Sequence, residues 1–422
     1  MIRRILLLFV LLAAGVTAFF VFYHPPMRLM PPPLLFQDPD TRVELLGAAP
    51  EDSRISLFYA TNRLPVGPRD YRVYTVAPDR SLHMGEAQLR VGGADTTWEQ
   101  LYKWSRGADP DESRPFIHLE GMQEQASLIR GGAPDGAVKG WLAEVEAALG
   151  GRADRDVLVY VHGANTTVER AAGQAAQLQH FTGRHAVVVL FAWPTAENFL
   201  RYSRDIESAF GGAPHLADLI ELLATGTSAR KIDVFTYSAG ATIGSAALAE
   251  LGHERPEIAD KLGEVYHAAP DADFRGFVAD LGAYGPHASR VTASLNMNDS
   301  ALRLAGIVNR GSRAGRPDLR ELTEGETDWL LDAGRAGMLQ VIQVKPDVMP
   351  NTTATSHTFW YDDPWVSNDL IVTLLFHLAP KARELEAAGS GQPYWLFPED
   401  YPDRMPALRD RLRSQVLQLT GP

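Results

Sequence analysis

The chain has 422 residues, of which 45% are hydrophobic and 22% are charged, and its formal net charge is −12. This length allows a large buried core, and the acidity argues against a nucleic acid as partner, because nucleic acids attract basic surfaces. The absence of cysteine excludes disulfide bonds, thiolate nucleophiles and cysteine-rich metal sites. The histidines show no H-E-x-x-H or comparable ligand spacing, so the sequence implies no metal and no other cofactor.

The N-terminus predicts a membrane segment or a leader. Arg3-Arg4 precedes the apolar run from Ile5 to Tyr23, whose length approaches the ~20 residues that span a bilayer. The positive flank is expected to stay cytoplasmic, which directs the rest of the chain outward. Val16-Thr17-Ala18 has the small-x-small character of a signal-peptidase site. Residues 1–24 are therefore expected to be a signal anchor or a cleaved signal peptide.

Prolines dominate the next segment, and strand-like and helix-like patterns follow it. Pro25-Pro26 and Pro31-Pro32-Pro33 predict a stiff, extended tether over residues 25–53. Alternating apolar residues predict edge strands at 55–59 and 87–91, and helices are expected at 97–104 and 138–149 with polar, turn-rich sequence between them.

From residue 156 onward, strand and helix patterns alternate, which predicts a mostly parallel sheet with helices on both faces. One domain over residues 54–388 accounts for this pattern. Residues 389–393 are expected to be a linker, and a terminal amphipathic helix completes a C-terminal segment over 389–422. The expected strands are 156–161, 186–192, 231–235, 263–267, 290–297 and 339–344, and the expected helices are 166–181, 214–223, 365–378 and 403–419.

A histidine and a glycine follow the first of these buried strands. The run DVLVYV at 156–161 ends in His162-Gly163-Ala164-Asn165. Such a loop can supply one backbone N–H of an oxyanion hole, here from Ala164 or Asn165. The alternative is a turn glycine beside a packed histidine.

A serine stands where a strand is expected to turn sharply into a helix. Thr236-Tyr237-Ser238-Ala239-Gly240 follows an apolar run and precedes a stretch of small residues. A strained elbow of this kind exposes a nucleophilic hydroxyl, and the N–H of Ala239 would face the developing oxyanion. Thr236 departs from the first glycine of the G-x-S-x-G pattern. The alternative is a small residue in a tight turn.

An acid and a histidine follow the serine in the order that a Ser-His-Asp triad requires in this kind of sheet. Asp299 comes after the predicted strand at 290–297, and His357 comes after the predicted last strand at 339–344. Asp271 or Asp273, which follow the preceding strand, are the alternative acids. The imidazole would accept the serine proton while the aspartate fixes its orientation.

Several separate segments carry a family resemblance. They are VLVYVHGANTT (157–167), FAWPTAENFLRYSRDIESA (191–209), FTYSAG (235–240), AAPDAD (268–273), NDSALRLA (298–305) and SHTFWYDDPWVSNDL (356–370), with LMPPPLLF (29–36) and FYATNR (58–63) upstream. In this order they resemble the alpha/beta-hydrolase superfamily, and within it a bacterial branch catalogued as a domain of unknown function. The resemblance implies an alpha/beta-hydrolase fold, with Ser238, Asp299 and His357 as the triad, and no particular substrate.

These observations together predict a serine hydrolase of the bacterial cell envelope. It would be anchored in the inner membrane facing the periplasm, or secreted into the periplasm if the leader is cleaved. An acyl-serine intermediate would cleave a small-molecule or lipid ester, a thioester or an amide. Trp193, Tyr202 and Phe359 are expected at the substrate-binding rim, with ordinary packing as their alternative, and Asp205 is either a solvated charge or a support of the site.

Two other functions fit the same pattern. A membrane-tethered binding module could keep the fold without catalysis, and Thr236 is the feature that favours it. An acyltransferase could use the same triad to pass the acyl group to an alcohol other than water. The oligomeric state does not follow from the sequence.

Overall fold

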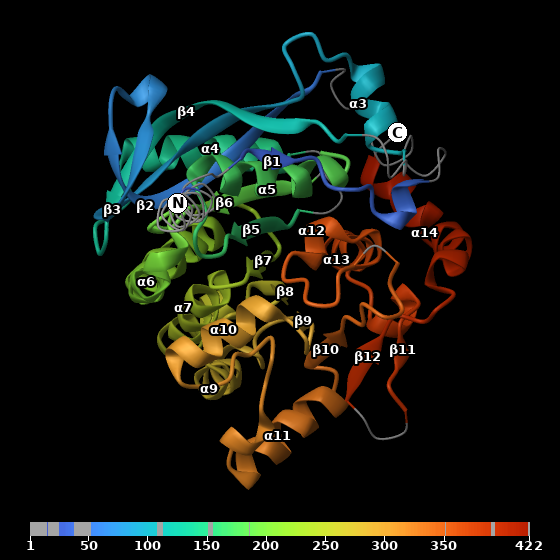
Figure 1. The fold of residues 1–422 in the computed structure, drawn as a ribbon. Coiled ribbons are helices and arrows are strands. Elements are labelled where there is room, and N and C mark those ends of the chain that lie inside the picture. Colours follow the sequence, from blue (N-terminus) through green and yellow to red (C-terminus); the bar gives the residue numbers. More distant parts are fainter. Residues whose placement is uncertain are drawn as a thin grey trace, which may run out of the picture.

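The computed structural model describes residues 15, 25–37, 52–107, 113–150, 155–184, 186–350, 352–389 and 393–420. Within them the strands form one twelve-stranded sheet in the order β1-β4-β3-β2-β6-β5-β7-β8-β9-β10-β12-β11 (Figure 1). Neighbours from β2 to β12 are parallel, and the pairs at the two ends of the sheet are antiparallel. The strands are β1 (Met27–Arg28), β2 (Arg54–Val66), β3 (Val73–Val91), β4 (Phe116–Ile129), β5 (Val157–Val161), β6 (Val187–Phe191), β7 (Ile232–Tyr237), β8 (Leu262–Ala268), β9 (Arg290–Leu295), β10 (Leu339–Gln343), β11 (Glu386–Ala387) and β12 (Tyr394–Leu396).

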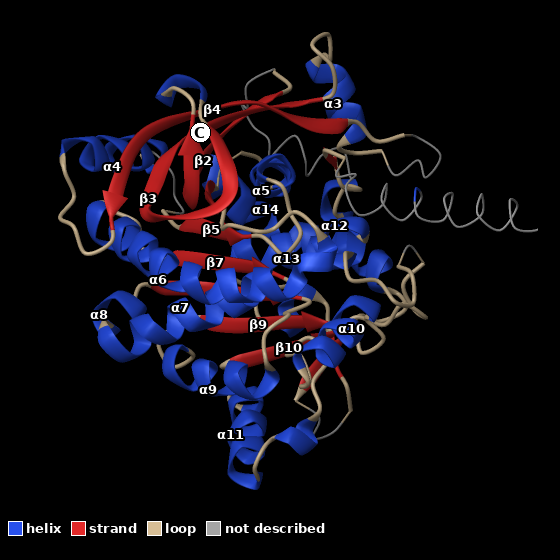
Figure 2. Cartoon of the chain, turned by 60° about the vertical axis from the view of Figure 1, so that its left-hand side comes forward, coloured by secondary structure: helices blue, strands red, loops and turns tan. Residues whose placement is uncertain are grey.

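The central strands are covered on both faces. Every residue of β5 and β6 is buried, and both strands are runs of β-branched and other apolar residues, as expected for parallel strands between two helix layers. One hydrophobic core includes side chains from α5, α13 and α14, a second includes side chains from α4, α6 and α7, and a smaller third cluster includes side chains from α9. Figure 2 shows the central strands side by side with helices packed around them.

Polar N-caps mark where several helices begin. Thr97 and Gln100 form a capping box at α3, Thr167 caps α5, and Asp363 caps α13. The α-helices are α3 (Trp98–Trp104), α4 (Gly136–Leu149), α5 (Val168–Phe181), α6 (Tyr202–Gly226), α7 (Gly240–Glu254), α8 (Pro256–Ala259), α9 (Phe274–Tyr284), α10 (Ser300–Asn309), α11 (Glu324–Arg335), α12 (Phe359–Asp362), α13 (Pro364–Phe376) and α14 (Met405–Thr420).

The proline-rich segment differs from the extended tether that the sequence predicts. In its described part, residues 25–37, β1 pairs with β4, and the 3₁₀ helix η1 (Leu34–Gln37) packs against the domain. Leu35 N donates to Asn368 Oδ1 of α13 at 2.8 Å. Leu29, Met30, Leu35 and Phe36 are buried in the first core. Together with Met27, these apolar side chains stabilise the docked position, so the segment belongs to the domain; residues 38–51 lie outside the described residues.

The C-terminal segment also belongs to the domain. Strands β11 and β12 flank the expected linker at 389–393, and they pair with each other while β12 pairs with β10. Leu408 and Leu412 of α14 are buried in the first core. The domain boundary expected at residue 388 is therefore not seen, because the sheet continues across it.

The expected membrane segment or leader, residues 1–24, lies outside the described residues except for Gly15. Among the helices that the structure does describe, none has the length and apolar character needed to cross a membrane.

Candidate active site

Ser238 occupies a strained turn between β7 and α7. Its φ is +52°, a left-handed conformation that is costly for a residue with a Cβ and that turns the chain sharply into the helix. Its N–H donates to Ala268 O at 3.0 Å. Gly240 is required beside it, because a Cβ there would lie 2.5 Å from Val161 O. Ser238 thus stands at the carboxyl edge of the parallel strands, where the sequence predicts it.

Thr236, which replaces a glycine of the usual pattern, is accommodated by its neighbours. A Cβ on Gly244 would lie 2.5 Å from the methyl group of Thr236, so the glycine in α7 leaves the space that the threonine needs. The hydroxyl of Thr236 lies 2.6 Å from His267 Nδ1, and His267 Nε2 lies 3.0 Å from the Tyr284 hydroxyl. The methyl group of Thr236 therefore has space beside Gly244, and its hydroxyl has a hydrogen-bond partner in His267.

Three side chains from three loops form a continuous hydrogen-bonded series. His357 Nε2 lies 2.8 Å from Ser238 Oγ, and His357 Nδ1 lies 2.6 Å from Asp299 Oδ2. Asp299 is fully buried between β9 and α10, and its other oxygen accepts the N–H of Leu302 at 3.0 Å as the N-cap of α10. Asn296 Nδ2 donates to Ser356 O at 3.0 Å, which fixes the histidine loop against the end of β9.

The alternative acids, Asp271 and Asp273, accept hydrogen bonds from other groups. Asp271 Oδ1 accepts from Arg313 Nε at 2.5 Å, and Asp271 Oδ2 accepts from the Tyr202 hydroxyl at 2.6 Å. Asp273 caps α9 by accepting the N–H of Gly276 at 2.9 Å. Neither carboxylate bonds His357 in the described part of the chain, because each is already held by other donors.

Of the three candidate oxyanion donors, two have an N–H that is unpaired within the described residues. The N–H groups of Ala239 and Ala164 make no described hydrogen bond. Asn165 N instead donates to Asp205 Oδ2 at 2.9 Å, so the expectation for Asn165 is wrong. The reason is the buried carboxylate of Asp205, which takes this N–H and holds Asn165 at a φ of +51°.

The His-Gly loop packs directly against the serine. A Cβ on Gly163 would lie 2.9 Å from Ser238 Cβ, so a larger residue there would displace Ser238. The ring of His162 stacks on that of Trp193 at 5.3 Å, and Trp193 Nε1 donates to His162 O at 2.7 Å. Burial, with a contribution from the charge of Arg63, lowers the pKa of His162 to about 3. His162 is therefore a neutral packing residue.

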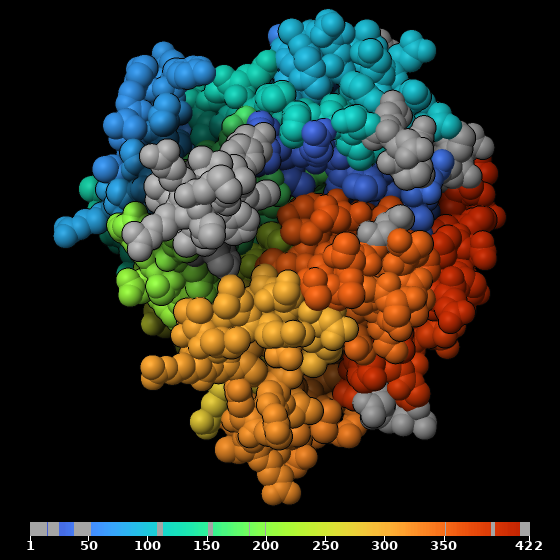
Figure 3. Space-filling view, in the orientation of Figure 1, coloured from blue at the N-terminus to red at the C-terminus, as the bar shows by residue number. Residues whose placement is uncertain are grey.

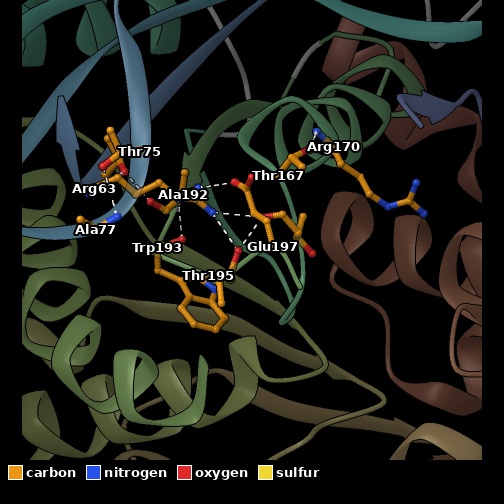
Figure 4. Close-up of polar contacts among 12 residues, drawn as sticks. Arg63, Thr75, Ala77, Thr167, Arg170, Ala192, Trp193, Thr195 and Glu197 are labelled. Carbon is orange, nitrogen blue, oxygen red and sulfur yellow. Dashed lines mark hydrogen bonds and ion pairs between the residues drawn. The ribbon is translucent and has the colours of Figure 1, made fainter. Parts of the chain in front are cut away.

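Asp205 and Arg63 support two loops beside the serine. Asp205 Oδ1 accepts the N–H of Ala196 at 2.6 Å, so its carboxylate joins the loop after β6 to the His-Gly loop. Arg63, fully buried on β2, donates to Trp193 O at 2.9 Å, Glu197 Oε1 at 2.7 Å and Thr195 Oγ1 at 3.0 Å (Figure 4). Burial raises the pKa of Asp205. Asp205 was expected to be either a solvated charge or a residue that supports the site, and its burial and hydrogen bonds fit the second alternative.

A pocket of about 340 Å³ opens at Ser238. Tyr202 lines it, as expected for a substrate-binding residue. Trp193 and Phe359 do not, because both are fully buried in the two cores. Its lining residues are Ala164, Asn165, Leu200, Tyr202, Ser203, Tyr237, Ser238, Asp271, Ala301, Leu302, Leu304, Ala305, Val308 and His357.

Sequence reasoning missed three contributors to the site. Arg63 lies in the FYATNR segment, which carries the family resemblance but receives no role from it. Asn296 lies at the end of the strand predicted at 290–297, and this position next to the predicted acid loop could have indicated its role. Helix α10 lines the pocket with apolar residues, and their helical spacing after Asp299 was visible in the sequence.

One group of described residues could hold a metal ion. Ligand atoms of Asp156, Asp233 and His377 lie within 4.8 Å of one another. Asp156 precedes β5, and Asp233 is near the start of β7. This group is therefore at the amino ends of the strands, whereas Ser238 lies at their carboxyl ends.

The family to which the chain belongs follows from a match to a known protein family. Residues 139–366, more than half of the chain, match a family described as "Alpha/beta hydrolase of unknown function (DUF900)". The chain belongs to this family. The DUF900 match includes Ser238, Asp299 and His357, and an alpha/beta-hydrolase fold is what the strand order and the serine elbow display.

Other comparisons are weaker. An esterase of Pyrobaculum calidifontis is 15% identical, with 54% of this chain and 78% of that chain covered and a TM-score of 0.31. A lipase-esterase related protein from Clostridium acetobutylicum is 10% identical, with 62% of this chain and 95% of that chain covered and a TM-score of 0.24. The search of curated proteins gave no match.

Proposed function

We propose that this DUF900 protein is a serine hydrolase that cleaves a carboxylic ester through an acyl-Ser238 intermediate. The observation that supports the proposal is the series of hydrogen bonds from Ser238 Oγ through His357 to Asp299, at 2.8 and 2.6 Å. These distances are within the reach required for proton transfer from a nucleophile to a base.

Each group has a defined part in the reaction. Asp299 stays ionised and accepts the Nδ1–H of His357, which leaves Nε2 free to take the proton of Ser238 as Oγ attacks the ester carbonyl carbon. The N–H groups of Ala239 and Ala164 stabilise the negative carbonyl oxygen of the tetrahedral intermediate. Its collapse breaks the bond to the leaving alkoxide, which His357 protonates.

Water completes the cycle. It attacks the acyl-serine carbonyl carbon and gives a proton to His357 Nε2, and the imidazolium returns that proton to Ser238 Oγ as the carboxylic acid leaves. The apolar lining from Leu200, Leu304 and Val308 favours an aliphatic acyl group over a charged one.

Replacement of the serine tests the proposal. Ser238→Ala is expected to abolish hydrolysis of a short p-nitrophenyl ester and labelling by a fluorophosphonate, while circular dichroism and the thermal midpoint remain close to those of the wild type. Ser245→Ala, which changes another serine in α7 away from the pocket, is the matched control and should keep both activities. Unchanged labelling of Ser238→Ala would exclude Ser238 as the nucleophile.

A further inference from the structure

An exposed apolar patch surrounds the mouth of the serine pocket. Leu200, Leu304 and Val308 line the pocket, yet 75%, 42% and 50% of their surfaces are exposed. Ile307, 70% exposed, lies on the same outward side of α10, whereas Leu302 and Ala305 are buried and line the pocket. Apolar residues that gather at a pocket mouth indicate an interaction surface.

Positive charges flank this patch. Arg303 and Arg310 lie on α10 and at its C-cap, and Arg201 and Arg204 lie on η3 (Phe199–Arg201) and in the first turn of α6. All four are exposed and form no ion pair with any residue that the structure describes. In Figure 3 the light-orange atoms of α10 face the viewer beside the green atoms of α6. Four unpaired arginines around one opening contrast with the net charge of −12 of the chain.

The N-terminal segment joins the domain at the same edge. The carbonyl of Pro25 accepts from Arg170 Nη1 at 3.3 Å, and Arg170 Nη2 lies 3.5 Å from the Tyr361 hydroxyl. The Tyr361 ring is 5.9 Å from that of Tyr237, the residue before Ser238. The apolar sequence from Ile5 to Tyr23 therefore precedes a point close to the pocket.

We propose that the patch of Leu200, Leu304, Ile307 and Val308, with its four arginines, docks on an anionic phospholipid surface. There Ser238 would cleave an acyl ester presented by that surface; this deepens, and rests on, the proposed hydrolase function. Guanidinium groups pair with lipid phosphates while the aliphatic side chains enter the acyl boundary. A second copy of this chain is the weaker occupant, because it would bring four more arginines to the same face.

Charge reversal on α10 tests the docking. The full chain is added to vesicles of phosphatidylcholine, with or without phosphatidylglycerol, that contain a fluorogenic acyl ester. The wild type should hydrolyse this ester about tenfold faster when phosphatidylglycerol is present, and Arg303→Glu/Arg310→Glu should reduce that ratio to about one. Neither residue lines the pocket, so the rate on a soluble short ester should change less than about twofold.

Two further variants complete the experiment. Arg80→Glu/Lys139→Glu carries the same change in charge on β3 and α4 and should keep the phosphatidylglycerol ratio. Ile307→Asp should lower the rate on both kinds of vesicle without changing the soluble rate. An unchanged ratio in Arg303→Glu/Arg310→Glu, an equal loss in the control, or full vesicle activity of Ile307→Asp would overturn the docking proposal. Full activity of Ser238→Ala on the soluble ester would instead overturn the proposed function.

Discussion

Two buried aspartates lie near Ser238, and their hydrogen-bond partners distinguish their roles. Asp299 has one oxygen on His357 Nδ1 and the other on the N–H of Leu302. Asp271 has its oxygens on Arg313 and Tyr202, which leaves it no contact with the imidazole within the described residues. Both aspartates lie near the serine, but only Asp299 directs a carboxylate oxygen at the imidazole of His357.

This difference predicts opposite phenotypes for two conservative changes. Asp299→Asn keeps the cap of α10 but favours the wrong tautomer of His357, so kcat for a soluble ester should fall by about 10⁴. Asp271→Asn leaves the buried guanidinium of Arg313 without its counter-charge, so it should cost about 3 kcal/mol of unfolding free energy and less than about tenfold in kcat. Steady-state kinetics and urea unfolding of both variants measure these effects. The opposite ranking of kcat would make Asp271 the acid.

The sequence predicts the positions of the candidate site residues better than it predicts which of their polar groups lack a hydrogen-bond partner. Ser238, Asp299 and His357 follow from their order after predicted strands. The state of the Asn165 N–H does not, because it depends on Asp205, a residue on another element. Trp193 likewise stands at a strand end, and only the packing of its ring on His162 shows that it is a core residue.

Helix α6 begins twelve residues before the start predicted at residue 214, and the added turns contribute residues to the site. Pro214 suggests a helix start, since proline favours the first turn, but the helix begins at Tyr202 and contains Pro214 within it. The buried stripe of Ala209, Ala213 and Leu216 continues across the proline, so packing outweighs the lost hydrogen bond. The early start places Asp205 next to the His-Gly loop.

The position of Asp205 in the first turn of α6 predicts a catalytic effect at a distance from the serine. In Asp205→Asn, only the amide oxygen can accept a hydrogen bond, because the NH₂ group is a donor. The N–H of either Asn165 or Ala196 then loses its acceptor, so the loop that carries Ala164 should become more mobile. We expect a loss of about 1–3 kcal/mol in unfolding free energy. We also expect about 10- to 100-fold lower kcat and slower fluorophosphonate labelling, with KM nearly unchanged.

Glu207→Gln is the matched control for this experiment, because it removes an exposed carboxylate from the same helix. It should leave stability, kcat and labelling rate unchanged. Wild-type kcat in a destabilised Asp205→Asn would show that Asp205 supports folding alone and does not position the oxyanion loop.

Strand elements at the antiparallel end of the sheet were the hardest to predict. β4 alternates buried residues with exposed ones and contains Gly121 and several polar side chains, so its sequence resembles a loop. β2 and β3 were both expected at an edge of the sheet, but β2 lies between β3 and β6, and β3 lies between β2 and β4. Pairing partners depend on long-range register, which the alternation of a single strand does not specify.

At the scale of the whole molecule, two buried histidines connect the serine loop and the strand before it to side chains of the interior. His162 lies beneath the serine loop, and His267 connects Thr236 of the elbow strand to Tyr284 of α9. Both histidines are fully buried, and burial lowers the pKa of each to about 3. An unfolded chain gives the same side chains a pKa of about 6.5.

This difference predicts that the domain loses stability in mild acid. Between pH of about 6.5 and about 3 the unfolded state binds protons that the folded state does not, so the free energy of unfolding is highest above this range and falls as the pH falls. From about pH 7 to about pH 5, each histidine should remove roughly 2 kcal/mol. His267→Gln should therefore lose about 2 kcal/mol less than the wild type over this interval, although it starts from a lower value at pH 7. Urea unfolding at both pH values measures the difference, and His118→Gln, on the exposed side of β4, should keep the wild-type dependence. The same dependence in His267→Gln as in the wild type would show that His267 takes up its proton in the folded state.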